Sequence, residues 1–200
     1  MIRSRNALTT VVGLLCVAGV LFTIRFMFTG GENEGFSEYP TITNLHVLPG
    51  LIYLALAPLQ FLSSVREKYP RYHRLSGRLL AVIGVVLGFT AVFISLVFPY
   101  SGLAEQIIVT GFGVFFLVSI IKGVQCARAR QFVRHREWMM RAFSIGLSIV
   151  TMRLIFIPML MATGGPTRED AELFSIVSFT IAFVIHAVGA ELWIRYSRPN

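Results

Sequence analysis

Six long apolar runs limit this chain to one kind of fold. They cover, approximately, residues Ala7–Phe28, Asn44–Val65, Leu75–Phe98, Leu103–Gln125, Trp138–Ala162 and Glu172–Trp193. A helix rises about 1.5 Å per residue and the hydrocarbon core of a bilayer is about 30 Å thick, so each run is long enough to cross it. No stretch alternates with a period of two over several strands, which disfavours a membrane barrel. The sequence therefore predicts an all-α membrane protein, with about six transmembrane helices in a single domain over residues 1–200.

Composition supports this interpretation. Hydrophobic residues make up 55% of the chain and charged residues 14%, with a mean hydropathy of +0.71. An ordinary soluble domain carries roughly 25% charged residues. The chain leaves no room for a soluble catalytic domain, so any chemistry is confined to the helices and their ends.

Basic residues are divided unevenly between the two sides that six spans would create. With the N-terminus inside, only Arg25, Arg153 and Arg168 of the 18 Lys and Arg residues fall in the outer half. Short loops rich in Lys and Arg remain in the cytoplasm. The pattern predicts cytoplasmic N- and C-termini in a multi-pass protein of the inner (plasma) membrane. It accounts for the net charge of +8 without nucleic-acid binding, and it predicts contact with anionic lipids at the cytoplasmic face.

The first run follows the basic stretch MIRSR, as the apolar part of a signal peptide would. It is longer than the usual range of about 7–15 residues, and no small-x-small cleavage site follows it, so we expect it to remain as a helix. Cys16 within this run and Cys126 at the inner end of the fourth lie outside any oxidising compartment, so no disulfide is expected.

Polar residues within such runs are costly and usually face the bundle interior, and four of those in this chain are candidates for a role there. They are His46, Gln60, Arg153 and His186. One hypothesis is that they line an internal polar path. Each also has a structural interpretation: Arg153 could extend its long side chain to the interface, and His186 could bond a neighbouring helix. Pro58 is expected to kink the second span.

Small and hydroxyl-bearing residues at helical spacing predict close packing. Gly84 and Gly88 form a small-xxx-small pair in the third run. Ser144, Ser148 and Thr151 share one face of the fifth run, and their hydroxyls could bond another helix or their own backbone carbonyls.

Two His-Arg pairs mark the inner ends of two spans. His73 lies in YHRLSGR and His135 in RHREWMMR. At about 1.5 Å per residue these two histidines share a depth, whereas His46 lies near the outer rim and His186 near the midplane. Only the first two can therefore supply two axial ligands to one haem. The arginines that would meet its propionates are Arg74, Arg78, Arg136 and Arg141.

The same residues suit other ligands. Arginines with histidines among them can bind an anionic head group, a phosphate or a quinone carbonyl. Zinc would need Glu67, Glu137 or Cys126 at spacings that match no usual site, so no metal site is predicted. A coordinating imidazole also gives its other N–H to an acceptor, which the sequence does not identify. Glu191, near the same rim, is expected to pair with an arginine.

Three ordered motifs run from about Leu45 to Ile155. They are LHVLPGLIYLALAPLQF, R-x-K-x-P-x-x-HRLSGR from Arg66, and HREWMMRAFSIGLSIVTMRL. Together they resemble a bacterial family of predicted membrane proteins, domain of unknown function two-three-zero-six. The resemblance implies a multi-helix integral membrane protein with no assigned activity. HRLSGR is also similar to the His-x-x-x-Gly-Arg stretches near haem ligands in b-type membrane cytochromes.

Two functional hypotheses follow. In the first, the chain is a redox-type membrane protein that binds haem b or a quinone at the cytoplasmic rim through His73, His135 and the neighbouring arginines. In the second, it is a small transporter, or a non-enzymatic subunit that associates with a membrane-protein partner or with itself, and its internal polar path includes Arg153. No nucleophile–base pair, Gly-rich phosphate loop or acidic dyad appears, so an ordinary hydrolase or kinase has no support.

Overall fold

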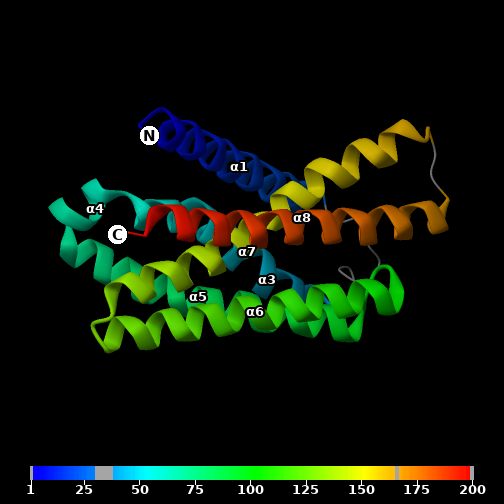
Figure 1. Ribbon diagram of the computed structural model, residues 1–200. Helices are drawn as coiled ribbons and strands as arrows, with labels where there is room; N and C mark the ends of the chain where they lie inside the picture. The colour runs from blue at the N-terminus through cyan, green and yellow to red at the C-terminus, as the bar shows by residue number, and fades with distance from the viewer. Residues whose placement is uncertain (1, 30–37, 165–166, 199–200) are drawn as a thin grey trace. The chain divides into compact units, whose positions relative to one another are not determined.

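The computed structural model describes residues 2–29, 38–164 and 167–198, and within these ranges all regular secondary structure is helical (Figure 1). Six helical segments are long and apolar enough to cross a membrane. The prediction of an all-α protein with six membrane spans is therefore confirmed, while the side on which the termini lie stays a prediction. The elements are α1 (Ile2–Thr29), α3 (Pro40–Leu56), the 3-10 helix η1 (Ala57–Phe61), α4 (Ser63–Lys68), α5 (Pro70–Val97), α6 (Gly102–Arg128), α7 (Phe132–Ala162) and α8 (Arg168–Ser197).

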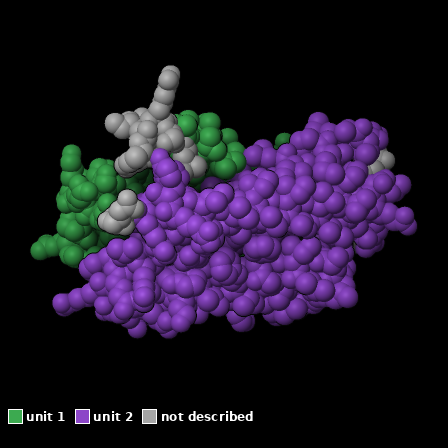
Figure 2. Space-filling model, viewed as in Figure 1, with its two compact units in different colours: residues 1–86 green, residues 87–200 purple. Residues whose placement is uncertain are grey.

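The chain divides into two compact units, residues 1–86 and 87–200 (Figure 2). The boundary falls within α5, which contributes residues to both. The prediction of one domain over residues 1–200 stays a prediction, and the two units are described separately below.

The second span differs from its predicted bounds. It covers Pro40–Phe61, so the predicted segment Asn44–Val65 began too late and ended too late. Proline decides both ends. Pro40 stands in the first turn of α3, where its fixed φ favours helix entry. Near Pro58 the α-helix gives way to η1, and Leu62 is extended, with φ −73° and ψ 123°. The expected kink thus takes the form of a change of helix type.

Two other spans begin earlier than predicted. α5 begins at Pro70 instead of Leu75, and α7 begins at Phe132 instead of Trp138. The added turns are polar, so hydropathy alone does not detect them. As a result His73 and His135 lie on helices and not in loops.

In the second unit, the helices bury small hydroxyl residues and expose large apolar ones. Ser119 and Ser178 have no exposed surface, whereas Leu103 is 70% exposed. This pattern of burial is the reverse of that in a soluble protein. It is typical of membrane helices that pack through small residues and present their large side chains to lipid. The arrangement supports a membrane environment independently of hydropathy.

Contacts within the second unit give the directions of its helices. Phe112 of α6 stacks on Phe183 of α8 with ring centroids 4.5 Å apart, and Glu105 near the start of α6 bonds Ser175 near the start of α8. These helices therefore run parallel. α7 runs antiparallel to both, and in Figure 1 it lies beside α6 from the turn that joins them. The end of α6, the start of α7 and the end of α8 thus share one basic end, which we call the basic end of the second unit.

Candidate functional site

A tight turn brings α6 and α7 together at the basic end. The N–H of Gln131 donates to the carbonyl of Cys126 (2.9 Å), and the N–H of Arg130 donates to the carbonyl of Ala127 (3.1 Å). This pair of bonds is a Schellman cap, and it places Arg130 in the left-handed region with φ 59°. Glycine is the usual residue at such a position because it lacks a Cβ. The cap ends α6 abruptly and lets α7 begin beside it.

His135 is held by α6. Its Nδ1 lies 2.8 Å from the carbonyl oxygen of Gly123. A carbonyl can only accept, so Nδ1 carries the proton and, in the neutral ring, Nε2 keeps its lone pair. Gly123 is buried where an added Cβ would lie 2.6 Å from Sδ of Met139. Glycine therefore lets α7 approach closely enough for the bond, and this supplies the acceptor that the sequence did not identify.

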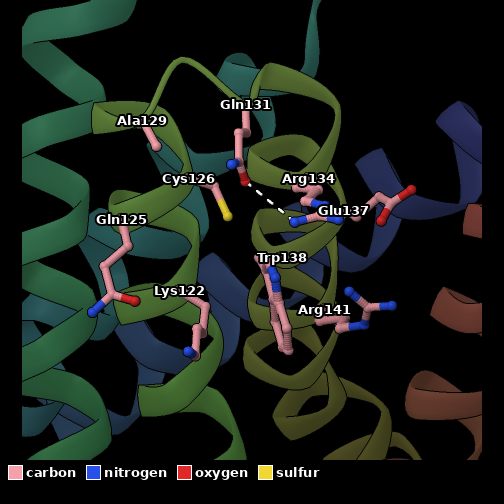
Figure 3. A pocket seen from close by; sticks show the side chains of 9 residues that line it. All are labelled: Lys122, Gln125, Cys126, Ala129, Gln131, Arg134, Glu137, Trp138 and Arg141. Carbon is pink, nitrogen blue, oxygen red and sulfur yellow. Dashed lines mark hydrogen bonds between the residues drawn. The ribbon is translucent and has the colours of Figure 1, made fainter.

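An open cleft of about 490 Å³ lies between the same two helices (Figure 3). Each helix presents residues at i, i+3, i+4 and i+7, the spacing of one helical face. The lining residues are Lys122, Gln125 and Cys126 of α6, Ala129 and Gln131 of the turn, and Arg134, Glu137, Trp138 and Arg141 of α7. His135 is not among them, because it lies on the neighbouring face of α7.

Arg141 is bound from two directions. Its Nε and Nη2 donate to the two carboxylate oxygens of Glu191 on α8, and the Nη2 bond is 3.0 Å long. Its guanidinium carbon also lies 4.7 Å from the ring centroid of Trp138. The expected pairing of Glu191 with an arginine is thereby confirmed. Because the charge of Arg141 is already balanced, Arg141 is a weaker candidate for a ligand's anionic group than the sequence indicated.

A second ion pair joins the start of α7 to the end of α8. Arg198 donates from Nε and Nη2 to the Glu137 carboxylate at 2.8 and 3.1 Å. Arg198 lies beyond the last residue of α8, and its hydrogen bonds to Glu137 raise the pKa of its guanidinium. Glu137 is thus committed to a structural contact, although its side chain borders the cleft.

His73, Arg74 and Arg78 lie on α5 within the first unit, with His73 half-buried and both arginines exposed. Part of the HRLSGR motif has a packing role. Nε2 of Gln60 donates to Oγ of Ser76 (2.8 Å), and an added Cβ on Gly77 would lie 3.2 Å from Oε1 of Gln60. Gln60, predicted to belong to an internal polar path, thus lies against the turn of α5 that follows His73.

His186 is held within the span by hydroxyls of α7. Ser144 donates to the His186 carbonyl (2.8 Å), and its Oγ lies 3.4 Å from Nδ1. The single hydroxyl proton of Ser144 is donated to that carbonyl. Nδ1 of His186 must therefore be the donor in the 3.4 Å bond to Oγ of Ser144. Nε2 then accepts from Thr151, whose Oγ1 is 2.8 Å away. The expected bond to a neighbouring helix is present, although Thr151 supplies a hydroxyl where a carbonyl is the commoner partner. Ser148 instead bonds the carbonyl of Ile145 in its own helix.

The remaining members of the predicted polar path are dispersed. Arg153 is half-buried on α7, and within the described ranges no hydrogen bond or ion pair involves its guanidinium. His46 is half-buried on α3, in the first unit. Arg136 is exposed near the start of α7. Among the described side chains, no three of His, Cys, Asp or Glu gather in a way that could hold a metal ion.

Sequence reasoning missed Glu105. Its side chain is buried, with 7% of the residue exposed. Ser175 of α8 donates to its Oε2 at 2.8 Å. Helical spacing contained a signal, because Glu105 lies at the start of α6 on the same face as Phe112, which packs on α8.

Comparison with protein families decides the identity of the chain. The family described as predicted membrane protein (DUF2306) matches residues 43–194. The chain belongs to this family. The match extends past Ile155, where the recognised motifs end, and includes most of α8. A search of curated proteins and a search of solved structures returned no match. Membership in the DUF2306 family establishes an integral membrane protein and assigns no reaction to it.

Proposed function

We propose that this protein is a redox-type membrane protein that binds haem b, or else a quinone, at the basic end of the second unit. The observation that carries the proposal is the bond from Nδ1 of His135 to the Gly123 carbonyl (2.8 Å). Histidines that ligate metals usually donate one ring N–H to such an acceptor, which orients the ring and raises the basicity of the other nitrogen. Nε2 of His135 would then be the atom that holds the haem iron.

The protonation of His135 distinguishes the two ligands. Haem iron requires a nitrogen with a lone pair, which the neutral ring offers at Nε2. A quinone carbonyl requires a donor, so His135 would have to carry a second proton. The hydrogen bond to Gly123 therefore favours haem b. Arg136 is exposed beside His135 and is the nearest candidate in sequence for a propionate. A second ligand from His73 stays a prediction.

The test is a visible absorption spectrum of the detergent-purified protein, first oxidised and then reduced with dithionite. We expect a Soret band that sharpens on reduction, together with α and β bands. His135→Ala should abolish it, and His73→Ala should abolish it only if His73 is the second ligand. Arg153→Ala is the control at another site and is expected to leave the spectrum unchanged. A colourless preparation from cells with ample haem excludes the haem form, and quinone extraction from wild type and His135→Ala then tests the quinone form.

A second candidate function is a transporter or an accessory subunit with an internal polar path. The bonds of His186 to Thr151 and the burial of Glu105 support it, because ionisable residues inside membranes usually mark such paths. Here Arg153→Ala should be the damaging change and the protein should be colourless. The spectrum therefore separates the two candidates before any substrate is known.

A further inference from the structure

We propose that the cleft between α6 and α7 is a binding site for a phosphate-bearing anion, with Lys122 and Arg134 as its charged partners. This site is separate from the haem or quinone site, because His135 does not line the cleft. The proposal therefore does not depend on the proposed function, and the two can fail independently.

The charges around the cleft are incompletely balanced. Three cations and one carboxylate line it. Glu137 is bound by Arg198, and Arg141 is bound by Glu191. Lys122 and Arg134 remain. In the part of the chain that the structure describes, no carboxylate pairs with either of them. Two positive charges thus face the cleft without a counterion among the described residues.

The cleft also provides hydrogen-bond donors in suitable number. Lys122 offers three N–H groups and Arg134 a planar fork, both suited to phosphate oxygens. Among the described residues, Arg134 makes one hydrogen bond, to Oε1 of Gln131. It is long, at 3.5 Å, so the guanidinium can turn toward a ligand at little cost. The amide groups of Gln125 and Gln131 add further donors. At about 490 Å³ the cleft is large enough for a phosphate and the group attached to it.

The cleft has residues of the kinds expected at a membrane interface. It lies where the polar ends of α6 and α7 begin, and Trp138 forms one wall (Figure 3). Tryptophan and lysine are typical of the head-group level. A phosphate of this kind could belong to an anionic lipid or to a soluble compound, and both would present the same oxygens to Lys122 and Arg134.

Cys126 gives a direct measurement of occupancy because it lines the cleft and is half-exposed. The chain has one other cysteine, the buried Cys16, and Cys16→Ala leaves a single reporter. The experiment measures the rate of Cys126 alkylation by an uncharged maleimide in nanodiscs. Three conditions are compared: phosphatidylcholine alone, phosphatidylcholine with inorganic phosphate against chloride of equal ionic strength, and phosphatidylcholine mixed with phosphatidylglycerol.

We expect bound anion to slow alkylation several-fold. The readout is the ratio of rates with and without anion, since removing cations also changes the reactivity of the thiol itself. Lys122→Gln/Arg134→Gln should bring this ratio to one. The matched control, Arg128→Gln/Arg195→Gln, removes the same charge from exposed positions that do not line the cleft, and it should keep the protection.

Each outcome decides the proposal. Protection by inorganic phosphate identifies a site for soluble phosphate compounds, and protection by phosphatidylglycerol alone identifies a lipid head-group site. Alkylation at equal rates in all three conditions overturns the proposal. Loss of protection in the control variant as well would also overturn it, because the effect would then be general charge screening.

Discussion

Arg141 and Glu191 form a two-bond ion pair that fastens α7 to α8, and Trp138 covers the guanidinium at 4.7 Å. The side chain of Arg141 is only 15% exposed, whereas that of Glu191 is 42% exposed. The pair is therefore intermediate between surface and buried ion pairs. It leaves α7 and α8 joined at the basic end, next to the cleft.

Removing the carboxylate should destabilise the protein. We expect Glu191→Gln to lower the free energy of unfolding by about 1–2 kcal/mol, between the values for exposed and buried pairs. Denaturant unfolding in detergent measures the change. Glu172→Gln is the matched control, because its pair with Arg168 is an exposed i,i+4 contact expected to contribute less than about 0.5 kcal/mol. Equal effects of the two substitutions would show that the two-bond geometry adds nothing.

The hydroxyl bond within the membrane should have a measurable coupling energy. A double-mutant cycle of Thr151→Val and His186→Phe should give about 0.5–1.5 kcal/mol, the range of hydrogen bonds between membrane helices. Thr180→Val is the control, since Thr180 is exposed and, among the described residues, its hydroxyl bonds only the Ile176 carbonyl of its own helix. It should cost little by itself and show no coupling to His186. A coupling near zero for Thr151 would mean that His186 finds another partner when the hydroxyl is lost.

Two glycines differ in what surrounds them. An added Cβ on Gly88 of α5 would lie 2.6 Å from Cγ and Cδ2 of Leu117 on α6, whereas one on Gly111 of α6 would meet nothing within 4 Å. Gly88→Ala should therefore destabilise the protein by about 1–3 kcal/mol through overpacking. Gly111→Ala should be neutral or stabilising by up to about 1 kcal/mol, because alanine favours the helix. Thermal unfolding of both variants tests the contrast, and similar melting temperatures would refute the close contact at Gly88.

The buried carboxylate of Glu105 should be replaceable by an amide. Glu105→Gln keeps an oxygen that accepts from Ser175 and should change stability little. Glu105→Ala removes the acceptor and leaves the serine hydroxyl unpaired, at a cost of about 1–3 kcal/mol. Unfolding measurements on both variants make the comparison. If the glutamine variant lost as much stability as the alanine variant, the negative charge itself would be required, which would favour a cation or proton path through this end of the protein.

The features predicted well from sequence depend on summed properties of long segments. Hydropathy over some twenty residues identifies a span whatever its neighbours are, so all six spans were found. Their ends were found less well. The second span was misplaced at both ends because prolines, and not hydropathy, determine where α3 and η1 begin and end. The early starts of α5 and α7 were missed because polar turns continue a helix without adding hydrophobicity.

Individual contacts also divide into those that the sequence predicts and those that it does not. That Glu191 would find an arginine was predictable, because a carboxylate near a basic rim has many partners to choose from. That the partner would be Arg141 was not, because the choice depends on how α7 is rotated against α8. The burial of Glu105 and the acceptor for His135 depend on the same kind of rotation.

The sequence by itself determined that the chain is a membrane protein with six spans and a strongly basic set of helix ends, because lipid acts on each segment separately through its apolar surface. Only the tertiary structure decided which polar groups meet. It bound Arg141 to Glu191, His186 to Thr151 and His135 to the Gly123 carbonyl, and it left Lys122 and Arg134 facing a cleft. The physical reason is that a hydrogen bond requires two atoms within about 3 Å, and that separation is set by helix rotation and by the small residues that permit close approach.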